Sequence, residues 1–175
     1  MRIAARIALL VLAAALVAGF LWKIASSRSE QGVGKPAPPT QGTDAEGVAF
    51  QLSDYHDKVV MLDFWADWCP HCRAMYSHDK KIVERYQKRP FVLLGVNADA
   101  DVETLKEVQE RQHLTWRSWF DGPPKGPLTE EWKIQGFPTI CLLDAAHVVR
   151  YEHVGAPDGD ELDAEIEKLV QEAEK

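Results

Sequence analysis

Cysteine is scarce in this sequence: only Cys69, Cys72 and Cys141 occur among 175 residues. An odd number of cysteines cannot form a fully paired framework, which excludes a small domain held together by disulfides alone. The composition is otherwise that of an ordinary globular protein, so a disordered or collagen-like chain is excluded as well. Two of the three cysteines are separated by only two residues, and this pair is the most informative feature of the chain.

Basic residues are also in short supply, since 20 lysines and arginines stand against 27 aspartates and glutamates. The resulting formal charge of −7 argues against nucleic-acid binding, which requires a basic face. The charge is unevenly distributed along the chain. Residues 1–35 carry five basic residues and one acidic residue, whereas the remaining 140 residues carry a formal charge of −11. An acidic body therefore follows a basic head.

The head contains an uncharged apolar run, Ile7–Trp22, which Arg2 and Arg6 precede and Lys23 follows. A membrane-spanning helix needs about 20 residues, with a lower limit of roughly 17. The run reaches that length if it continues to Ala25 and the ammonium group of Lys23 extends to the membrane interface. Residues 1–25 are therefore expected to form a single membrane anchor. Because basic residues stay on the cytoplasmic side, the acidic body is expected outside the cytoplasm.

A cleaved signal peptide is the alternative interpretation of the head. Such peptides end in small residues of the Ala-x-Ala type, and here Phe20–Lys23 interrupts any such site. The anchor is therefore favoured over a secreted product. Both interpretations predict an exported body, at the periplasmic side of the inner membrane if the anchor is kept.

The body is expected to consist of a linker and one α/β domain. Residues 26–41 are rich in Ser, Gly and Pro, which indicates a linker, and residues 42–175 form the domain. Apolar runs predict strands at Val48–Leu52, Lys58–Trp65, Phe91–Ala98, Trp116–Phe120, Thr139–Leu143 and Val148–His153. Apolar spacings of three and four predict helices at Pro70–Lys88, Val102–His113 and Asp158–Glu174, with at most a short helix at Leu128–Trp132. This order predicts a mixed sheet with helices on both faces.

The cysteine pair lies where a predicted strand gives way to a predicted helix. The first helical turn has unpaired N–H groups and a partial positive charge, so the pKa of a thiol at Cys69 should fall below its usual 8.5. Pro70 suits this turn because it has no N–H to leave unpaired. His71 adds a donor and, when protonated, a cation beside the thiolate.

Cys72 lies one helical turn after Cys69, close enough for a disulfide and more shielded from solvent. Cys69 is therefore the expected attacking thiol and Cys72 the resolving one, with a mixed disulfide between Cys69 and the substrate as intermediate. Two other interpretations of the pair remain open. A zinc site would need further ligands at similar spacing, and a purely structural disulfide is possible in an exported protein. Haem attachment is excluded, because it would need His at the position of Arg73.

Three motifs of the chain together resemble a known family. Asp63-Phe64-Trp65-Ala66 is followed by Trp68-Cys69-Pro70-His71-Cys72 and, some 65 residues later, by Gly136-Phe137-Pro138-Thr139. The order and spacing resemble the thioredoxin superfamily over residues 34–175. The apolar head, the proline-rich entry and the Val48–Leu52 strand are most similar to the exported, membrane-anchored oxidoreductases of the TlpA/ResA type. The resemblance implies a thioredoxin-like fold and thiol–disulfide exchange with protein substrates and a membrane redox partner.

The resemblance also implies roles for individual residues. Pro138 matches a cis-proline that faces the cysteines and receives the substrate backbone, with Phe137 beside it and Trp68 at the rim. Asp63 matches a buried acid that takes the proton of Cys72, although members of the TlpA/ResA type often differ there. An edge or solvent-facing strand residue is the alternative for Asp63, and a buried, inert thiol is expected at Cys141.

The direction of electron transfer and the cofactor are separate questions. Pro-His between the cysteines resembles strongly oxidising proteins of the DsbA type, whereas TlpA/ResA-type proteins are usually reductants. No bound cofactor or metal is expected beyond the redox-active Cys69–Cys72 disulfide, and the protein is expected to be a monomer. Two alternative functions belong to related scaffolds. A Sco-like copper module uses Cys-x₃-Cys with a distant His, and a thiol peroxidase needs a Thr upstream of its Cys that this chain lacks.

Overall fold

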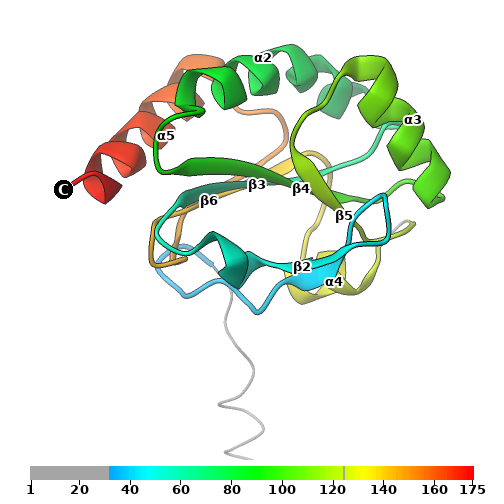
Figure 1. The fold of residues 1–175 in the computed structure, drawn as a ribbon, viewed down its shortest axis with the longest axis horizontal. Coiled ribbons are helices and arrows are strands. Elements are labelled where there is room, and N and C mark those ends of the chain that lie inside the picture. Colours follow the sequence, from blue (N-terminus) through cyan, green and yellow to red (C-terminus); the bar gives the residue numbers. More distant parts are fainter. Residues whose placement is uncertain (1–31, 124) are drawn as a thin grey trace, which may run out of the picture. The chain divides into compact units, whose positions relative to one another are not determined.

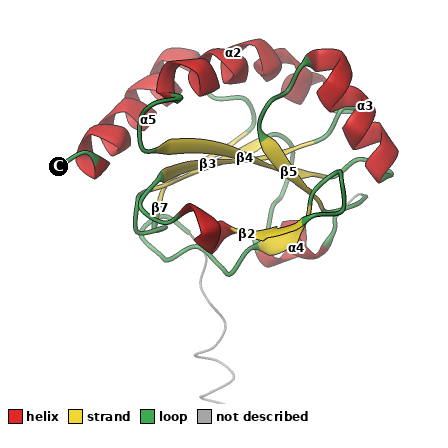
Figure 2. Ribbon diagram, viewed as in Figure 1, coloured by secondary structure: helices red, strands yellow, loops and turns green. Residues whose placement is uncertain are grey.

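The structure, a computed structural model, describes residues 32–123 and 125–175. The predicted anchor, residues 1–25, lies outside these residues. Within them, no helix has both the length and the apolar character needed to cross a membrane. The predicted mixed sheet is confirmed as a five-stranded sheet with the order β5-β4-β3-β6-β7 (Figures 1 and 2). Strands β3, β4 and β5 run parallel, and β6 pairs antiparallel with both β3 and β7.

The elements follow the predicted order closely. The strands are β1 (Gln41–Thr43), β2 (Ala49–Gln51), β3 (Val59–Trp65), β4 (Phe91–Asn97), β5 (Arg117–Phe120), β6 (Thr139–Leu143) and β7 (Val149–Val154). The helices are η1 (Leu52–Tyr55, a 3₁₀ turn), α2 (Pro70–Tyr86), α3 (Val102–Gln112), α4 (Pro127–Glu131) and α5 (Gly159–Ala173). Asp158 caps α5 by accepting the N–H groups of Asp160 and Glu161.

Two layers of core cover the sheet. Side chains alternate along a strand, so Met61 and Trp65 of β3 join one buried cluster, while Leu62 and Phe64 join the other. The first cluster includes residues of α2, α3 and α5, and the second includes residues of α4, β2 and η1. Figure 1 shows the same division, with α2, α3 and α5 above the sheet and α4 and β2 below it. Both faces of the central strand β3 are therefore covered.

The entry to the domain differs from the sequence expectation. A short strand, β1, pairs antiparallel with β2, and no strand was predicted there because Gln-Gly-Thr carries no strand pattern. The strand predicted at Val48–Leu52 is shorter, because Leu52 already belongs to η1. Part of the predicted linker also pairs with the body, since the N–H groups of Gly34 and Ala37 donate to Val149 and His147.

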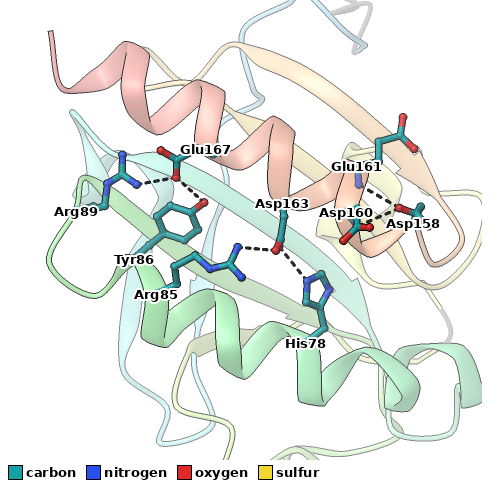
Figure 3. A network of polar contacts seen from close by, with 9 residues as sticks. All are labelled: His78, Arg85, Tyr86, Arg89, Asp158, Asp160, Glu161, Asp163 and Glu167. Atoms are coloured by element: carbon teal, nitrogen blue, oxygen red, sulfur yellow. Dashed lines mark hydrogen bonds and ion pairs between the residues drawn. The ribbon is translucent and has the colours of Figure 1, made fainter.

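Ion pairs join α2 to α5 along their outer faces (Figure 3). Asp163 contacts both His78 and Arg85 of α2, and Glu167 accepts from the Tyr86 hydroxyl at 3.0 Å and from Arg89 at 2.7 Å. The same helices also share buried apolar residues. Contacts with α5 thus fix helix α2 in place, and with it the direction of its first turn.

Trp119 of β5 joins the main sheet to the β1–β2 ribbon. Its ring is fully buried, stacks on Phe50 at a centroid distance of 4.1 Å, and donates from Nε1 to the Phe50 carbonyl at 3.1 Å. Trp119→Ala is expected to lower the free energy of unfolding by about 3–5 kcal/mol, as measured by urea denaturation. Val48→Ala, at an exposed side chain, should change it by less than about 0.5 kcal/mol. Similar midpoints for the two variants would contradict the assigned role of Trp119.

Candidate active site

The two cysteines lie at the start of α2 and form a disulfide, with their Cα atoms 5.3 Å apart. Cys69 is the N-cap residue, and its Sγ accepts the backbone N–H of Cys72 at 3.2 Å. Pro70 occupies the first helical turn, where its missing N–H costs no hydrogen bond. A thiolate at Cys69 would therefore have a backbone donor already in place.

Exposure does not distinguish the two cysteines as the sequence predicted. Cys69 is 3% exposed and Cys72 is 2% exposed, because both side chains turn into the core beside Met75 and Tyr76. The expectation that Cys72 is the more shielded thiol is therefore not supported in the oxidised form. The two differ instead in position, since Cys69 is the residue that caps the helix. His71 between them is exposed.

An aromatic pair lies beside the disulfide. The ring of Trp68 is 55% exposed and meets Phe137 edge to face at a centroid distance of 5.6 Å. The peptide bond between Phe137 and Pro138 is cis, as the resemblance implied. The carbonyl of Pro138 accepts the N–H of Gly155 at 2.8 Å, which ties this loop to the end of β7. The structure thus brings the cis-proline loop of Phe137 and Pro138 to Trp68, the residue that precedes Cys69.

The loop before Cys69 is held by a buried carboxylate. Asp99 is 1% exposed and accepts the backbone N–H of Asp67 with both oxygens, at 2.9 and 3.1 Å. It also accepts the side-chain amide of Asn97 at 2.7 Å. The indole Nε1 of Trp68 donates to the Ala98 carbonyl at 3.2 Å. The segment after β4 therefore fixes both the backbone before Cys69 and the ring of Trp68.

Two arginines hold the same loop from outside. Arg111 of α3 binds the Asp67 carboxylate at 2.8 Å, and Arg73 of α2 donates to the Asp67 carbonyl. Both arginines are exposed, so these contacts restrict the conformation of the loop but add little to the free energy of unfolding. No local pattern predicts this network, because Asp99 and Arg111 lie 32 and 44 residues away from Asp67, and Arg73 is its one member nearby in the chain.

Asp63 lies in the middle of β3, between β4 and β6, and is 3% exposed. A solvent-facing or edge position for this residue is therefore wrong. Its place in the alternation of β3 puts it on the face of Met61 and Trp65, the face that α2 covers. Burial raises the pKa of the Asp63 carboxyl well above its usual value, and Asp79 raises it further.

Cys141 lies on β6 and belongs to the core cluster on the opposite face of the sheet from the disulfide. It is a free, buried thiol. Burial raises its pKa, and nearby Glu152 adds to the effect. The thiolate form is therefore suppressed, in agreement with the inert thiol that the sequence predicted. Within the described ranges, no three His, Cys, Asp or Glu side chains gather in a way that could hold a metal ion.

Comparison with known proteins gives consistent matches across the domain. The sequence pattern of the Redoxin family matches residues 32–169. The chain is 27% identical over 161 residues to thiol-disulfide oxidoreductase ResA of Geobacillus kaustophilus, covering 92% of this chain and 91% of the relative. It is 28% identical over 183 residues to thiol:disulfide interchange protein DsbE of Escherichia coli K12, covering 95% and 93%.

Solved structures match at the level of the fold. A putative DsbE from Chlorobium tepidum superposes with a TM-score of 0.70 at 27% identity, covering 82% of this chain and 99% of that structure. The C-terminal domain of a putative thiol-disulfide oxidoreductase from Bacteroides thetaiotaomicron gives a TM-score of 0.73 at 25% identity, covering 81% and 97%. The fold is therefore thioredoxin-like, as the resemblance implied.

Proposed function

Because this chain belongs to the Redoxin family and is a thiol–disulfide oxidoreductase, we propose that it exchanges disulfides with protein substrates through Cys69 and Cys72. One observation carries the assignment of roles: Sγ of Cys69 caps α2 and accepts the N–H of Cys72 at 3.2 Å. This donor and the helix terminus stabilise negative charge on Cys69 more than on Cys72. Cys69 is therefore the nucleophile and Cys72 the resolving thiol.

The exchange passes through two sulfur transfers. In the reduced protein, the Cys69 thiolate attacks a substrate disulfide, so that a Cys69–substrate bond forms while the second substrate sulfur leaves as a thiolate. The Cys72 thiol then loses its proton and attacks Sγ of Cys69, which forms the Cys69–Cys72 disulfide and releases the first substrate sulfur as a thiolate. The substrate gains two electrons and the protein loses two. The reverse sequence oxidises a substrate dithiol.

Three further roles follow from the arrangement of the site. Trp68, Phe137 and Pro138 form the surface that receives the substrate chain beside Cys69, because the exposed Trp68 directly precedes Cys69 and its ring contacts the cis-proline loop. Asp63 accepts the proton of Cys72, since it lies buried on the face of β3 beneath α2. His71 is exposed between the cysteines and, when protonated, favours the thiolate at Cys69.

We also propose that the domain works outside the cytoplasm, tethered by residues 1–25 to the inner membrane. The support is the uncharged run Ile7–Trp22 behind two arginines, followed by an acidic body. A membrane redox partner would then restore the state of the disulfide. The disulfide itself serves as the redox group, and the domain acts as a monomer with no bound cofactor or nucleic acid.

Trapping of the mixed disulfide tests this function. The variant Cys72→Ala cannot resolve the intermediate, so protein substrates should accumulate on Cys69 and migrate as complexes on non-reducing gels. The double variant Cys69→Ala, Cys72→Ala is the matched control and should trap nothing. If complexes fail to form with Cys72→Ala in the native compartment, or form equally in the control, the proposed exchange through Cys69 is wrong.

A further inference from the structure

Besides Asp63 on β3, a second buried acid lies on the sheet-facing side of helix α2, and the proposed exchange does not use it. This acid is Asp79, which lies seven residues, or two helical turns, after Cys72 and therefore on the same side of the helix. Met75 and Tyr76 lie between them on that side. Asp79 is only 1% exposed. A buried acid among apolar residues is costly unless it is paired or protonated, and its presence here calls for a partner.

The structure offers that partner in Asp63. Both acids lie on the side of the sheet that α2 covers, and each has an Oδ1 atom that no donor reaches among the described residues. An ionised carboxylate only accepts hydrogen bonds, so two such groups can bond to each other only through a shared proton. Among the described residues, Asp79 is the charged group that acts on the Asp63 carboxyl, and no cation balances it. A shared proton is then what can reduce the negative charge of the two carboxyl groups and join them by a hydrogen bond.

We propose that Asp63 and Asp79 form a carboxyl pair that holds one proton between them and takes up a second from Cys72 during disulfide exchange. This inference rests on the proposed function and extends it, because it makes Asp79 a positioning residue that acts through Asp63. A single buried acid would have to carry a full negative charge between exchanges. The pair shares that charge over two groups and stays in the apolar layer with at most one net charge.

The proton balance of the resolving step follows from this arrangement. The singly protonated pair accepts the proton of the Cys72 thiol and becomes neutral. The Cys72 thiolate attacks Sγ of Cys69, the Cys69–Cys72 bond forms, and the substrate sulfur leaves as a thiolate. The neutral pair then returns one proton to solvent. In the reverse direction, the neutral pair protonates the Cys72 thiolate as that sulfur leaves the disulfide.

The surroundings of the pair favour protonated carboxyls. Burial raises the pKa of Asp79 to about 7, and burial together with Asp79 raises that of Asp63. Tyr76 on α2 faces this region and interacts with Asp63, Asp67 and Asp99, which are all acids, so burial and these charges raise its own pKa. The buried side chains that α3, α5 and β6 contribute to this layer are apolar, among them Leu105, Val108, Ile140, Leu162 and Ile166, while Asp163 and Glu167 of α5 are paired with His78, Arg85 and Arg89.

Titration of the aspartate carboxyl carbons by NMR tests the pair in the full-length oxidised protein. Two coupled groups titrate in two steps that belong to both, so the Cγ resonances of Asp63 and Asp79 should each show the same two midpoints. The variants Asp79→Asn and Asp63→Asn should each abolish the upper step of the remaining acid. If the Asp63 titration is unchanged in Asp79→Asn, the pair does not exist. The wild-type curves alone decide the question should a variant fail to fold.

A kinetic measurement separates this inference from the proposed function. The resolving step, followed by quenched decay of a Cys69–glutathione mixed disulfide, should slow by about tenfold in Asp79→Asn near neutral pH and lose its dependence on the upper titration step. Asp160→Asn, the control, removes an exposed acid of α5 outside the pair and should leave the midpoint of the pH profile in place. If Cys72→Ala still traps substrates while the Asp79→Asn profile is unchanged, the inference is wrong and the function stands.

Discussion

Cys69→Ser is expected to reduce protein-disulfide exchange by about three orders of magnitude or more, the scale seen when a covalent nucleophile is removed. The hydroxyl of serine has no accessible anion near neutral pH, so the hydrogen bond from the Cys72 N–H would have no thiolate to stabilise. The rate of reduction of a disulfide-bonded protein substrate, measured as thiol release with a dithiol electron donor, checks this expectation.

Cys141→Ala is the matched control for this prediction. Its thiol is free and buried on the opposite face of the sheet, where its raised pKa suppresses the thiolate. Exchange should therefore stay within about twofold of the wild-type rate, since a small buried thiol contributes by packing alone. A large loss of activity in Cys141→Ala, or a substantial residual rate in Cys69→Ser, would contradict the assignment of Cys69 as the nucleophile.

The parts of the fold that the sequence predicted are those with local patterns. The run Lys58–Trp65 is apolar and β-branched throughout, and β3 occupies it from Val59 to Trp65 as a strand buried on both faces. Helix α2 begins at Pro70 as expected, because Cys69 and Pro70 together suit an N-cap and first turn. The cysteines, Trp68, Phe137 and Pro138 could be named in advance for the same reason: their motifs are short and contiguous.

The parts that were missed depend on distant contacts. Strand β1 exists because β2 pairs with it, and no property of Gln-Gly-Thr indicates this pairing. Asp99 follows a strand and resembles any loop acid until the fold places it against the Asp67 N–H. Asp79 is the exception, because its spacing of seven residues from Cys72 places it on the apolar side of the predicted helix. An acid at an apolar position was a visible indication of a special role.

Asp79→Asn is expected to make the oxidised protein more stable than the wild type at alkaline pH and to have little effect near pH 4. Burial raises the pKa of Asp79 in the folded state to about 7 from an ordinary value of 3.8. Between these values the folded chain binds more protons than the unfolded chain, so stability falls as pH rises. The stability that protonation of Asp79 provides is complete below about pH 4 and is lost as pH passes through 7.

The asparagine side chain does not ionise, so the variant escapes this loss. Relative to wild type, its free energy of unfolding should increase by about 3 kcal/mol between pH 4 and pH 8, from 1.36 kcal/mol per pKa unit with an allowance for relaxation of the buried site. Urea denaturation at several pH values measures the difference, and comparison with wild type cancels the titration of groups that do not interact with Asp79, which leaves that of the coupled Asp63.

Asp101→Asn provides a control of opposite sign. Asp101 caps α3 and accepts the Thr104 N–H at 2.8 Å, and these hydrogen bonds lower the pKa of its carboxyl. A lowered folded-state pKa contributes stability that is fully present above the unfolded value of 3.8 and is lost as pH falls through the folded value, so this variant should be less stable than wild type by a constant amount from about pH 5 upward and approach it at lower pH. If Asp79→Asn followed the same trend as Asp101→Asn, the Asp79 carboxyl would have to be ionised and satisfied in the folded protein. The proposal that Asp63 and Asp79 share a proton would then be wrong, and Asp63 alone would have to accept the proton of Cys72.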